Sequence, residues 1–226
     1  MLIAVICMSI YVICEAINIG RTLKALNEKT SFFNNIKYAL IGFFFSGITP
    51  AASGGQPMQI YYMYKDKISV ANSTLALLIN LSSMQVVTIS LALISVVINH
   101  NILNTALAWF FVIGIALNAS ALSLLLIAIF SKKLLKKLIN LVVKIMKKIK
   151  IKNVEQKQEK IEAELSKYQD SSDYIKNNKL VILKTIITTY IEFLALYSVS
   201  YWVYRSFGLN EYNICLLYTS DAADEL

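Results

Sequence analysis

The sequence predicts an all-α integral membrane protein with about four spanning helices and a re-entrant hairpin, as a truncated fragment of a larger helical bundle. Of the 226 residues, 57% are hydrophobic and only 16% are charged, with a mean hydropathy of +0.57. A soluble domain of this size would need more polar surface. The apolar residues also form runs of about 18 or more, the length that crosses a bilayer as a helix. Both prolines and a glycine pair interrupt one further apolar segment.

Four apolar runs are long enough to span the membrane. They are Leu2–Ile19, Val70–Asn99, Thr105–Phe130 and Leu180–Tyr204. The first run has the position of a signal peptide, but it lacks a basic N-terminal region and a small-residue cleavage pattern, and it contains Glu15. We therefore interpret it as a span.

Basic residues are unevenly distributed along the chain and predict the topology. Fourteen lysines lie between Lys132 and Lys179, whereas the link between the second and third runs carries only His100. Further basic residues follow the first run and the interrupted segment: Arg21, Lys24, Lys29, Lys37, Lys65 and Lys67. Because cytoplasmic loops are enriched in Lys and Arg, we expect these segments in the cytoplasm and the His100 link outside.

The interrupted segment, Tyr38–Tyr64, is expected to form the re-entrant hairpin because both of its flanks are basic. A segment that enters and leaves on one side does not span, and Pro50 to Pro57 would form its bend. As a helix, Tyr38–Gly47 would rise about 15 Å, roughly half of the hydrocarbon thickness. Irregular backbone at that depth is tolerated where protein buries it or a wet cavity solvates it. The alternative is an ordinary span that ends at Pro50 and is followed by a loop.

Residues 132–178 are expected to form a cytoplasmic loop of amphipathic and charged helices. Ser131–Lys152 places apolar and basic side chains on opposite helix faces, which is typical of a helix in the membrane interface. Continuation of the preceding span into the cytosol is the alternative. Asn153–Asn178 is predicted to be a solvated, mixed-charge helix or linker with little apolar surface apart from Ile161 and Leu165.

The last residues, 215–226, are interpreted as foreign to the protein. Within them, Cys215–Glu225 resembles the translation of a transposase sequencing adaptor in one reading frame. We therefore exclude this segment from the fold and assign residues 1–214 to one transmembrane region. The natural sequence is expected to continue beyond about Ile214.

Motifs for nucleotide binding, hydrolysis or metal binding do not stand out in the sequence, and we expect no metal and no cofactor. Ser53, Gly54 and Gly55 do not form a P-loop, because no Gly-Lys-Ser/Thr follows them. The single histidine, His100, is expected in a solvated turn. An enzymatic activity has no direct support in these residues, and we identify no catalytic residue.

Two carboxylates at membrane depth are candidate functional residues. Glu15 lies near the end of the first run, and Glu192 lies near the middle of the last. Ionisable side chains there are costly and usually face a bundle interior or a polar cavity. The alternatives are structural pairing for Glu192 and extension toward the Arg21 side for Glu15. Interhelical hydrogen bonds are expected of the polar residues in the second run, Asn80, Ser82, Ser83 and Gln85.

The hairpin bend is the strongest candidate site. Small residues from Ala51 to Gly55 would let backbone amides approach a ligand closely. Gln56 is expected to begin the returning half-helix, with Pro57 at a favoured first-turn position. The exposed amides and positive dipole end of that helix suit an anion such as a phosphate. The residues expected to contact a lipid head group are Thr49, Pro50, Ser53, Gly54, Gly55, Gln56 and Pro57, together with Glu15 and Glu192.

The segment ITPAASGGQPMQIYYMYKDKISVANSTLALLI, which begins at Ile48, resembles the N-terminal motif of the integral-membrane region of lysylphosphatidylglycerol synthetases. The Thr-Pro and Ser-Gly-Gly-Gln-Pro elements and the following Tyr, Lys, Ile and Ser carry the resemblance, which extends over most of Leu2–Ile214. The family has a second Pro- and Gly-rich re-entrant motif that this sequence lacks. Also absent is the soluble domain that transfers lysine from lysyl-tRNA to phosphatidylglycerol.

The resemblance implies a flippase-like protein of the bacterial plasma membrane that moves phospholipid or aminoacylated phospholipid between leaflets. The alternative is the membrane part of a phosphatidylglycerol lysyltransferase, and a third reading is a small-solute transporter or a non-transporting scaffold. The expected partners are the membrane and its anionic phospholipids, with a homo-oligomer left open and no nucleic acid bound.

Overall fold

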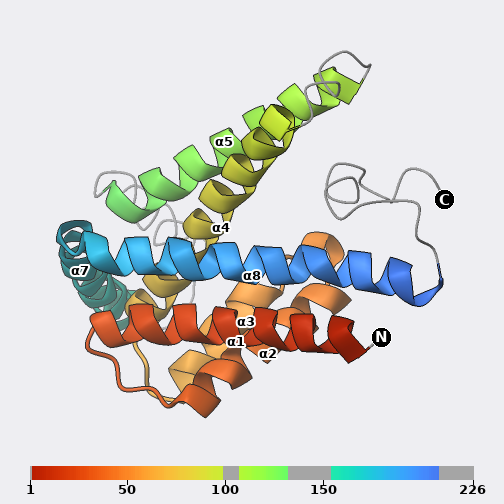
Figure 1. The fold of residues 1–226 in the computed structure, drawn as a ribbon. Coiled ribbons are helices and arrows are strands. Elements are labelled where there is room, and N and C mark those ends of the chain that lie inside the picture. Colours follow the sequence, from red (N-terminus) through yellow and green to blue (C-terminus); the bar gives the residue numbers. More distant parts are fainter. Residues whose placement is uncertain (1, 99–106, 132–153, 209–226) are drawn as a thin grey trace.

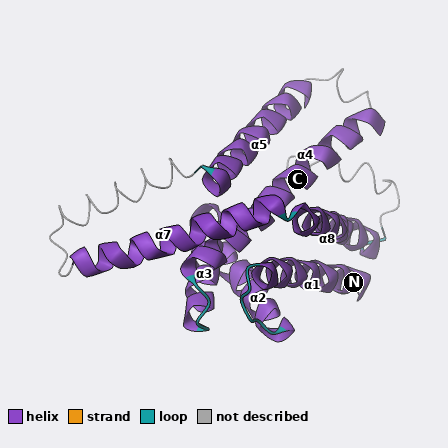
Figure 2. Ribbon diagram, turned by 90° about the vertical axis from the view of Figure 1, so that its left-hand side faces the viewer, coloured by secondary structure: helices purple, strands orange, loops and turns teal. Residues whose placement is uncertain are grey.

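The computed structural model describes residues 2–98, 107–131 and 154–208, which form helices and short connections without any strand (Figures 1 and 2). Residues 132–152 of the predicted amphipathic helix, the His100 turn and the segment 215–226 lie outside the described residues. The helices are α1 (Leu2–Ala25), α2 (Phe32–Ile48), the 3₁₀ turn η1 (Pro50–Ala52), α3 (Gly55–Lys65), α4 (Val70–Ile98), α5 (Leu107–Phe130), α7 (Val154–Asn177) and α8 (Lys179–Ser206).

Four helices within the described residues are long and apolar enough to cross a membrane: α1, α4, α5 and α8. They coincide with the four predicted runs, so the all-helical membrane fold is confirmed. Helix α1 continues to Ala25, beyond the predicted end at Ile19, and therefore includes Arg21 and Lys24. Basic side chains at a helix end can extend into the membrane interface, so they do not terminate the helix.

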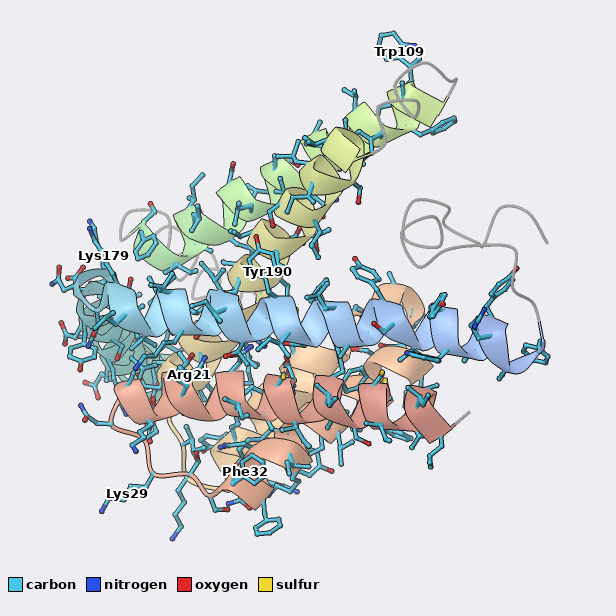
Figure 3. All side chains as sticks on the ribbon, viewed as in Figure 1. Arg21, Lys29, Phe32, Trp109, Lys179 and Tyr190 are labelled. Atoms are coloured by element: carbon cyan, nitrogen blue, oxygen red, sulfur yellow. The ribbon has the colours of Figure 1, made fainter. Side chains whose placement is uncertain are left out.

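Helices α1 and α8 form an antiparallel pair and lie side by side in both ribbon views (Figures 1 and 2). Arg21 near the end of α1 lies between the two helices (Figure 3). Its guanidinium donates to the carbonyl oxygen of Lys184 at 2.7 Å and to Thr188 Oγ1 at 2.9 Å, both near the start of α8. Arg21 therefore ties the basic end of α1 to the beginning of α8.

Helices α4 and α5 form a second antiparallel pair that diverges from α1 and α8 (Figure 1). Tyr190 of α8 approaches α4, where its hydroxyl meets Ser90 Oγ (Figure 3). Large apolar side chains of α5, including Trp109, Leu117 and Leu124, are mostly exposed. Such a surface is suited to lipid, since hydrocarbon tails are as apolar as these side chains.

Helices α2 and α3 fold back on each other as a hairpin, as the sequence predicts. Gln59 Nε2 of α3 donates to the carbonyl oxygen of Tyr38 at 3.1 Å. At the open end, Asp66 accepts hydrogen bonds from Lys37 Nζ and, at 2.6 Å, from the Tyr38 hydroxyl. These bonds hold the pKa of the Asp66 carboxyl below its ordinary value. The chain thus enters and leaves the hairpin at one end.

Helix α2 is longer than expected, because it begins at Phe32 rather than Tyr38. Ser31 caps it by accepting a hydrogen bond from the backbone N–H of Asn34 at 3.2 Å. At 1.5 Å per residue, its 17 residues extend about 26 Å instead of the expected 15 Å. The arm is therefore most of a hydrocarbon thickness long. It ends at Ile48 because Thr49, which precedes a proline, is extended.

Helix α7 corrects one part of the prediction that Asn153–Asn178 is a solvated, mixed-charge helix or linker. The segment is helical, but one of its faces is buried against the ends of α4, α5 and α8 (Figure 2). Tyr168 is 5% exposed and Ile175 is fully buried. The Tyr168 hydroxyl donates to the carbonyl oxygen of Ala128 at 3.1 Å, and Ser172 Oγ donates to that of Ile129 at 2.6 Å. The charged residues of α7 outnumber its apolar ones, so the sequence did not indicate this buried face.

Candidate functional site

The bend between α2 and α3 is held by local hydrogen bonds. Thr49 Oγ1 donates to the carbonyl oxygen of Phe45 at 2.6 Å and accepts from the Gly54 N–H at 2.9 Å. Ser53 Oγ donates to the carbonyl oxygen of Pro50 at 2.9 Å. The two hydroxyls that were expected to contact a head group are thus already engaged within the bend, and their contact with a ligand stays a prediction.

Strain in the bend falls on alanines and not on the glycines. Ala51 and Ala52 both have a φ of +52°, a left-handed conformation that L residues rarely adopt. Each such residue costs on the order of 1–3 kcal/mol, and the surrounding structure must enforce it. Gly54 precedes α3 in an ordinary right-handed conformation, with φ of −84°. Its glycine character is therefore not explained by backbone angles.

Gly54 and Gly55 instead allow close packing. A Cβ on Gly54 would lie 2.6 Å from Thr49 Cγ2, and a Cβ on Gly55 would lie 2.9 Å from the backbone oxygen of Gly42. Gly42 in turn faces Gln59, whose Nε2 would be 2.4 Å from a Cβ at position 42. The structure shows close approach within the bend at Gly54 and between α2 and α3 at Gly55, and the expected close approach to a ligand stays a prediction.

A pocket of about 230 Å³ opens between this hairpin and helices α1 and α4. It has room for several water molecules. Three of the predicted site residues line it: Glu15 from α1, and Gly55 and Gln56 from the first turn of α3. The other lining residues are Tyr11, Ala39, Gly42, Phe43, Ser46, Gln59 and Met84. The predicted residues Thr49, Pro50, Ser53 and Gly54 belong to the bend and Pro57 to the first turn of α3, and none of the five lines the pocket.

Glu15 and Glu192 meet next to this pocket, although they come from α1 and α8. Glu192 is fully buried and Glu15 is 8% exposed. Asn80 Nδ2 of α4 donates to Glu15 Oε2 at 2.8 Å. Asn18 Nδ2 of α1 donates to Glu192 Oε2 at 3.2 Å and also contacts Thr189 Oγ1 at 3.1 Å. The carboxyl groups are close enough to hydrogen-bond to each other when one of them carries a proton.

These contacts decide the alternative for Glu15 and test the interhelical hydrogen bonds expected of α4. Glu15 does not extend toward Arg21, because its side chain is buried and bonded to Asn80. Asn80 forms the expected interhelical hydrogen bond. The same expectation is wrong for Ser82 and Ser83, whose hydroxyls donate to carbonyl oxygens of their own helix at 2.8 Å and 3.0 Å.

The contributors to this site that were not identified from the sequence include Tyr11 and Asn18 of α1 and Gln59 of α3. Asn18 lies three residues after Glu15 in an apolar run, so helical spacing places both on one face. That spacing was a usable signal. In the described residues, no group of three or more His, Cys, Asp or Glu side chains is arranged to hold a metal ion.

The comparisons agree with the membrane fold and with the motif in the hairpin. The family model described as "Lysylphosphatidylglycerol synthase TM region" matches residues 1–212. Neither a curated protein nor a solved structure gives a significant match. The matched residues include the hairpin, the pocket and both carboxylates. The chain therefore belongs to the lysylphosphatidylglycerol synthase TM region family, as a multi-pass membrane protein.

Proposed function

We propose that this chain moves phospholipid, or aminoacylated phospholipid, between the leaflets of a bacterial plasma membrane. The observation that carries the proposal is the pocket between the hairpin, α1 and α4, which offers polar groups within a bundle of apolar helices. A head group that crosses hydrocarbon needs substitutes for water, because an unpaired polar or charged group there is costly. The acyl chains would remain outside, along exposed apolar surfaces such as that of α5.

The pocket offers partners of both signs to a head group. Its lining includes the first turn of α3, at Gly55 and Gln56, where helix N–H groups and the positive end of the dipole favour a phosphate. Glu15 lies on the α1 side and favours an amine. A head group carrying both a phosphate and an ammonium group therefore matches the lining better than phosphate alone.

The basic segments support an arrangement in which anionic phospholipids gather at the cytoplasmic surface. Arg21, Lys37 and the loop from Lys132 to Lys179 would lie on that side. The description of the matched family also favours a second role, as the membrane part of a phosphatidylglycerol lysyltransferase. In that role, the same pocket would receive lipid made by a catalytic domain.

The test uses the full-length protein in liposomes with fluorescent phospholipid and a quencher restricted to the outer leaflet. Met84→Trp should fill the pocket from α4 and slow lipid movement about tenfold, equivalent to a barrier higher by about 1.4 kcal/mol. Leu93→Trp is the matched control, because Leu93 is 51% exposed on the same helix. It should leave the rate unchanged.

Two outcomes would contradict the proposal. Lipid movement no faster than in protein-free liposomes would remove the function. Movement at the wild-type rate in a folded Met84→Trp protein would remove this pocket from the path.

Glu192→Gln should slow aminoacylated lipid more than phosphatidylglycerol, because the carboxylate is expected to meet the amine.

A further inference from the structure

The carboxyl groups of Glu15 and Glu192 form a buried pair that the proposed path alone does not explain. An amide donor holds one oxygen of each: Asn80 binds Glu15 Oε2 and Asn18 binds Glu192 Oε2. The other oxygen of Glu192, Oε1, is buried and has no hydrogen-bond partner. Asn80 Oδ1 is a second buried acceptor without a partner, and its side chain is 3% exposed. Two buried acceptor oxygens of the site therefore lack a hydrogen-bond donor.

The neighbouring side chains do not supply a counter-ion. Within the described residues, no Lys or Arg forms an ion pair with either carboxylate. Arg21 does not pair with either carboxylate. It donates to Asn18 Oδ1 at 3.0 Å, whereas Asn18 Nδ2 faces Glu192. The other titratable groups facing the pair, Tyr11 and Cys14, are both on α1. The remaining elements contribute uncharged polar groups: Ser46 from α2, Gln56 and Gln59 from α3, Asn80 from α4, and Thr189 from α8.

Two adjacent carboxylates cannot both stay ionised in such a place, because their repulsion is strong where water is excluded. A proton shared by the two carboxyl groups would leave a pair with a single negative charge. We infer that Glu15 and Glu192 form a proton-binding site that exchanges its proton for a primary ammonium group entering the pocket. The exchange, though not the proton site, rests on the proposed function.

The exchange balances in charge. Before it, the pair holds one proton and carries a charge of −1. Afterwards, two carboxylates and one ammonium ion again sum to −1, and the released proton passes to water in the pocket that Glu15 lines. The interior thus never holds the charge of two unpaired carboxylates, which is the costly state. Movement of an amine-bearing head group would be coupled to proton movement in the opposite direction.

Proton release by the purified full-length protein tests the exchange without requiring transport. Short-chain lysylphosphatidylglycerol is added to the protein in weakly buffered detergent containing a pH-sensitive dye. We expect release of about one proton per chain, as linkage requires when a bound cation replaces a proton. Short-chain phosphatidylglycerol, which lacks the amine, should release none. Neither should the double variant Glu15→Gln/Glu192→Gln, whereas Glu159→Gln, at an exposed carboxyl of α7, should behave as wild type.

Infrared spectroscopy tests the proton site itself. At neutral pH, the wild type should show the carbonyl-stretch absorption of a protonated carboxyl, and the double variant should lose it. Met84→Trp should keep this absorption but lose proton release. It replaces the double variant in the test if the double variant does not fold. A wild type without the absorption, or equal proton release by both lipids, would overturn the inference. Proton release without lipid movement in liposomes would instead contradict the proposed function and leave the site standing.

Discussion

Glycines determine how closely the helix backbones approach in this protein. A Cβ on Gly20 would lie 2.2 Å from Asn35 Nδ2, and one on Gly42 would lie 2.4 Å from Gln59 Nε2. These neighbours are the ends of side chains and can shift. Gly55 differs, because one of its neighbours is the backbone oxygen of Gly42, which can move only if α2 and α3 separate. A large residue at position 55 would therefore disrupt the hairpin and not merely block the pocket.

The first prediction compares two glycines of the hairpin. Gly55→Ala should destabilise the protein by about 1–3 kcal/mol, the usual cost of overpacking a close contact. Gly47→Ala is the matched control, because a Cβ there meets nothing within 4 Å. It should be neutral or should stabilise α2 by up to about 1 kcal/mol through helix propensity. Unfolding midpoints of the purified proteins in detergent measure both effects, and equal midpoints for the two variants would refute the packing role.

The hairpin is the element that most distinguishes this fold from a plain helical bundle. Hydrogen bonds from Lys37 and Tyr38 to Asp66 hold its two arms together at the open end. A hydrogen bond from the Gly54 N–H to Thr49 holds its bend. Its open end also packs with the end of α1 and the start of α4, since Leu23 and Ala76 share a buried cluster with Met63. This arrangement favours entry and exit on one side of the membrane, the side on which the basic residues gather.

The second prediction tests that topology. In a variant without Cys7, Cys14 and Cys215, single cysteines at Lys37 and Lys65 should react with an impermeant thiol reagent only from the cytoplasmic side. A cysteine at His100 should react only from the opposite side, because the preceding helix α4 spans. Inside-out and right-side-out vesicles distinguish the two. Reaction of positions 37 and 65 from opposite sides would establish an ordinary span.

At the scale of the whole molecule, α7 joins parts of the bundle that are far apart in sequence. Glu164 Oε2 accepts a hydrogen bond from the Ala71 N–H at 2.9 Å and so caps the start of α4. Glu28, after α1, accepts from Asn72 Nδ2 at 2.7 Å and pairs with Lys167 at 3.3 Å. Burial raises the pKa of Glu28, but these hydrogen bonds outweigh it and hold the pKa below its ordinary value. Helix α7 is thus packed against the connection after α1 and the start of α4.

The third prediction concerns this docking. Tyr168→Ala removes a buried ring and its hydrogen bond to α5, so α7 should open more readily and its amides should exchange hydrogen about tenfold faster or more. Tyr174→Ala is the matched control, because Tyr174 is 47% exposed on the same helix. Hydrogen exchange followed by mass spectrometry reads Val154–Asn177 separately from the hairpin. Unchanged exchange in Tyr168→Ala would show that α7 is held by other contacts.

The sequence by itself determined the membrane class, the four spans, the hairpin and the family. Each depends on a local property: the length of an apolar run, a proline at position 50, or a motif beginning at Ile48. A bilayer makes such properties decisive, since its thickness fixes the length of a helix and its interior excludes unpaired backbone groups. The start of α2 was missed because its Ser31 cap lies outside the apolar run.

Only the tertiary structure decided how the polar residues meet. Asn18 and Glu192 are 174 positions apart, and their contact depends on how α1 and α8 are rotated against each other. The same holds for position 55. Its requirement for glycine becomes visible only once the backbone of Gly42 lies opposite it. It also holds for Tyr168, whose burial on a charged helix depends on the ends of α4 and α5. The composition of a segment shows whether it belongs in water or in lipid, whereas tertiary packing decides which residues it contacts.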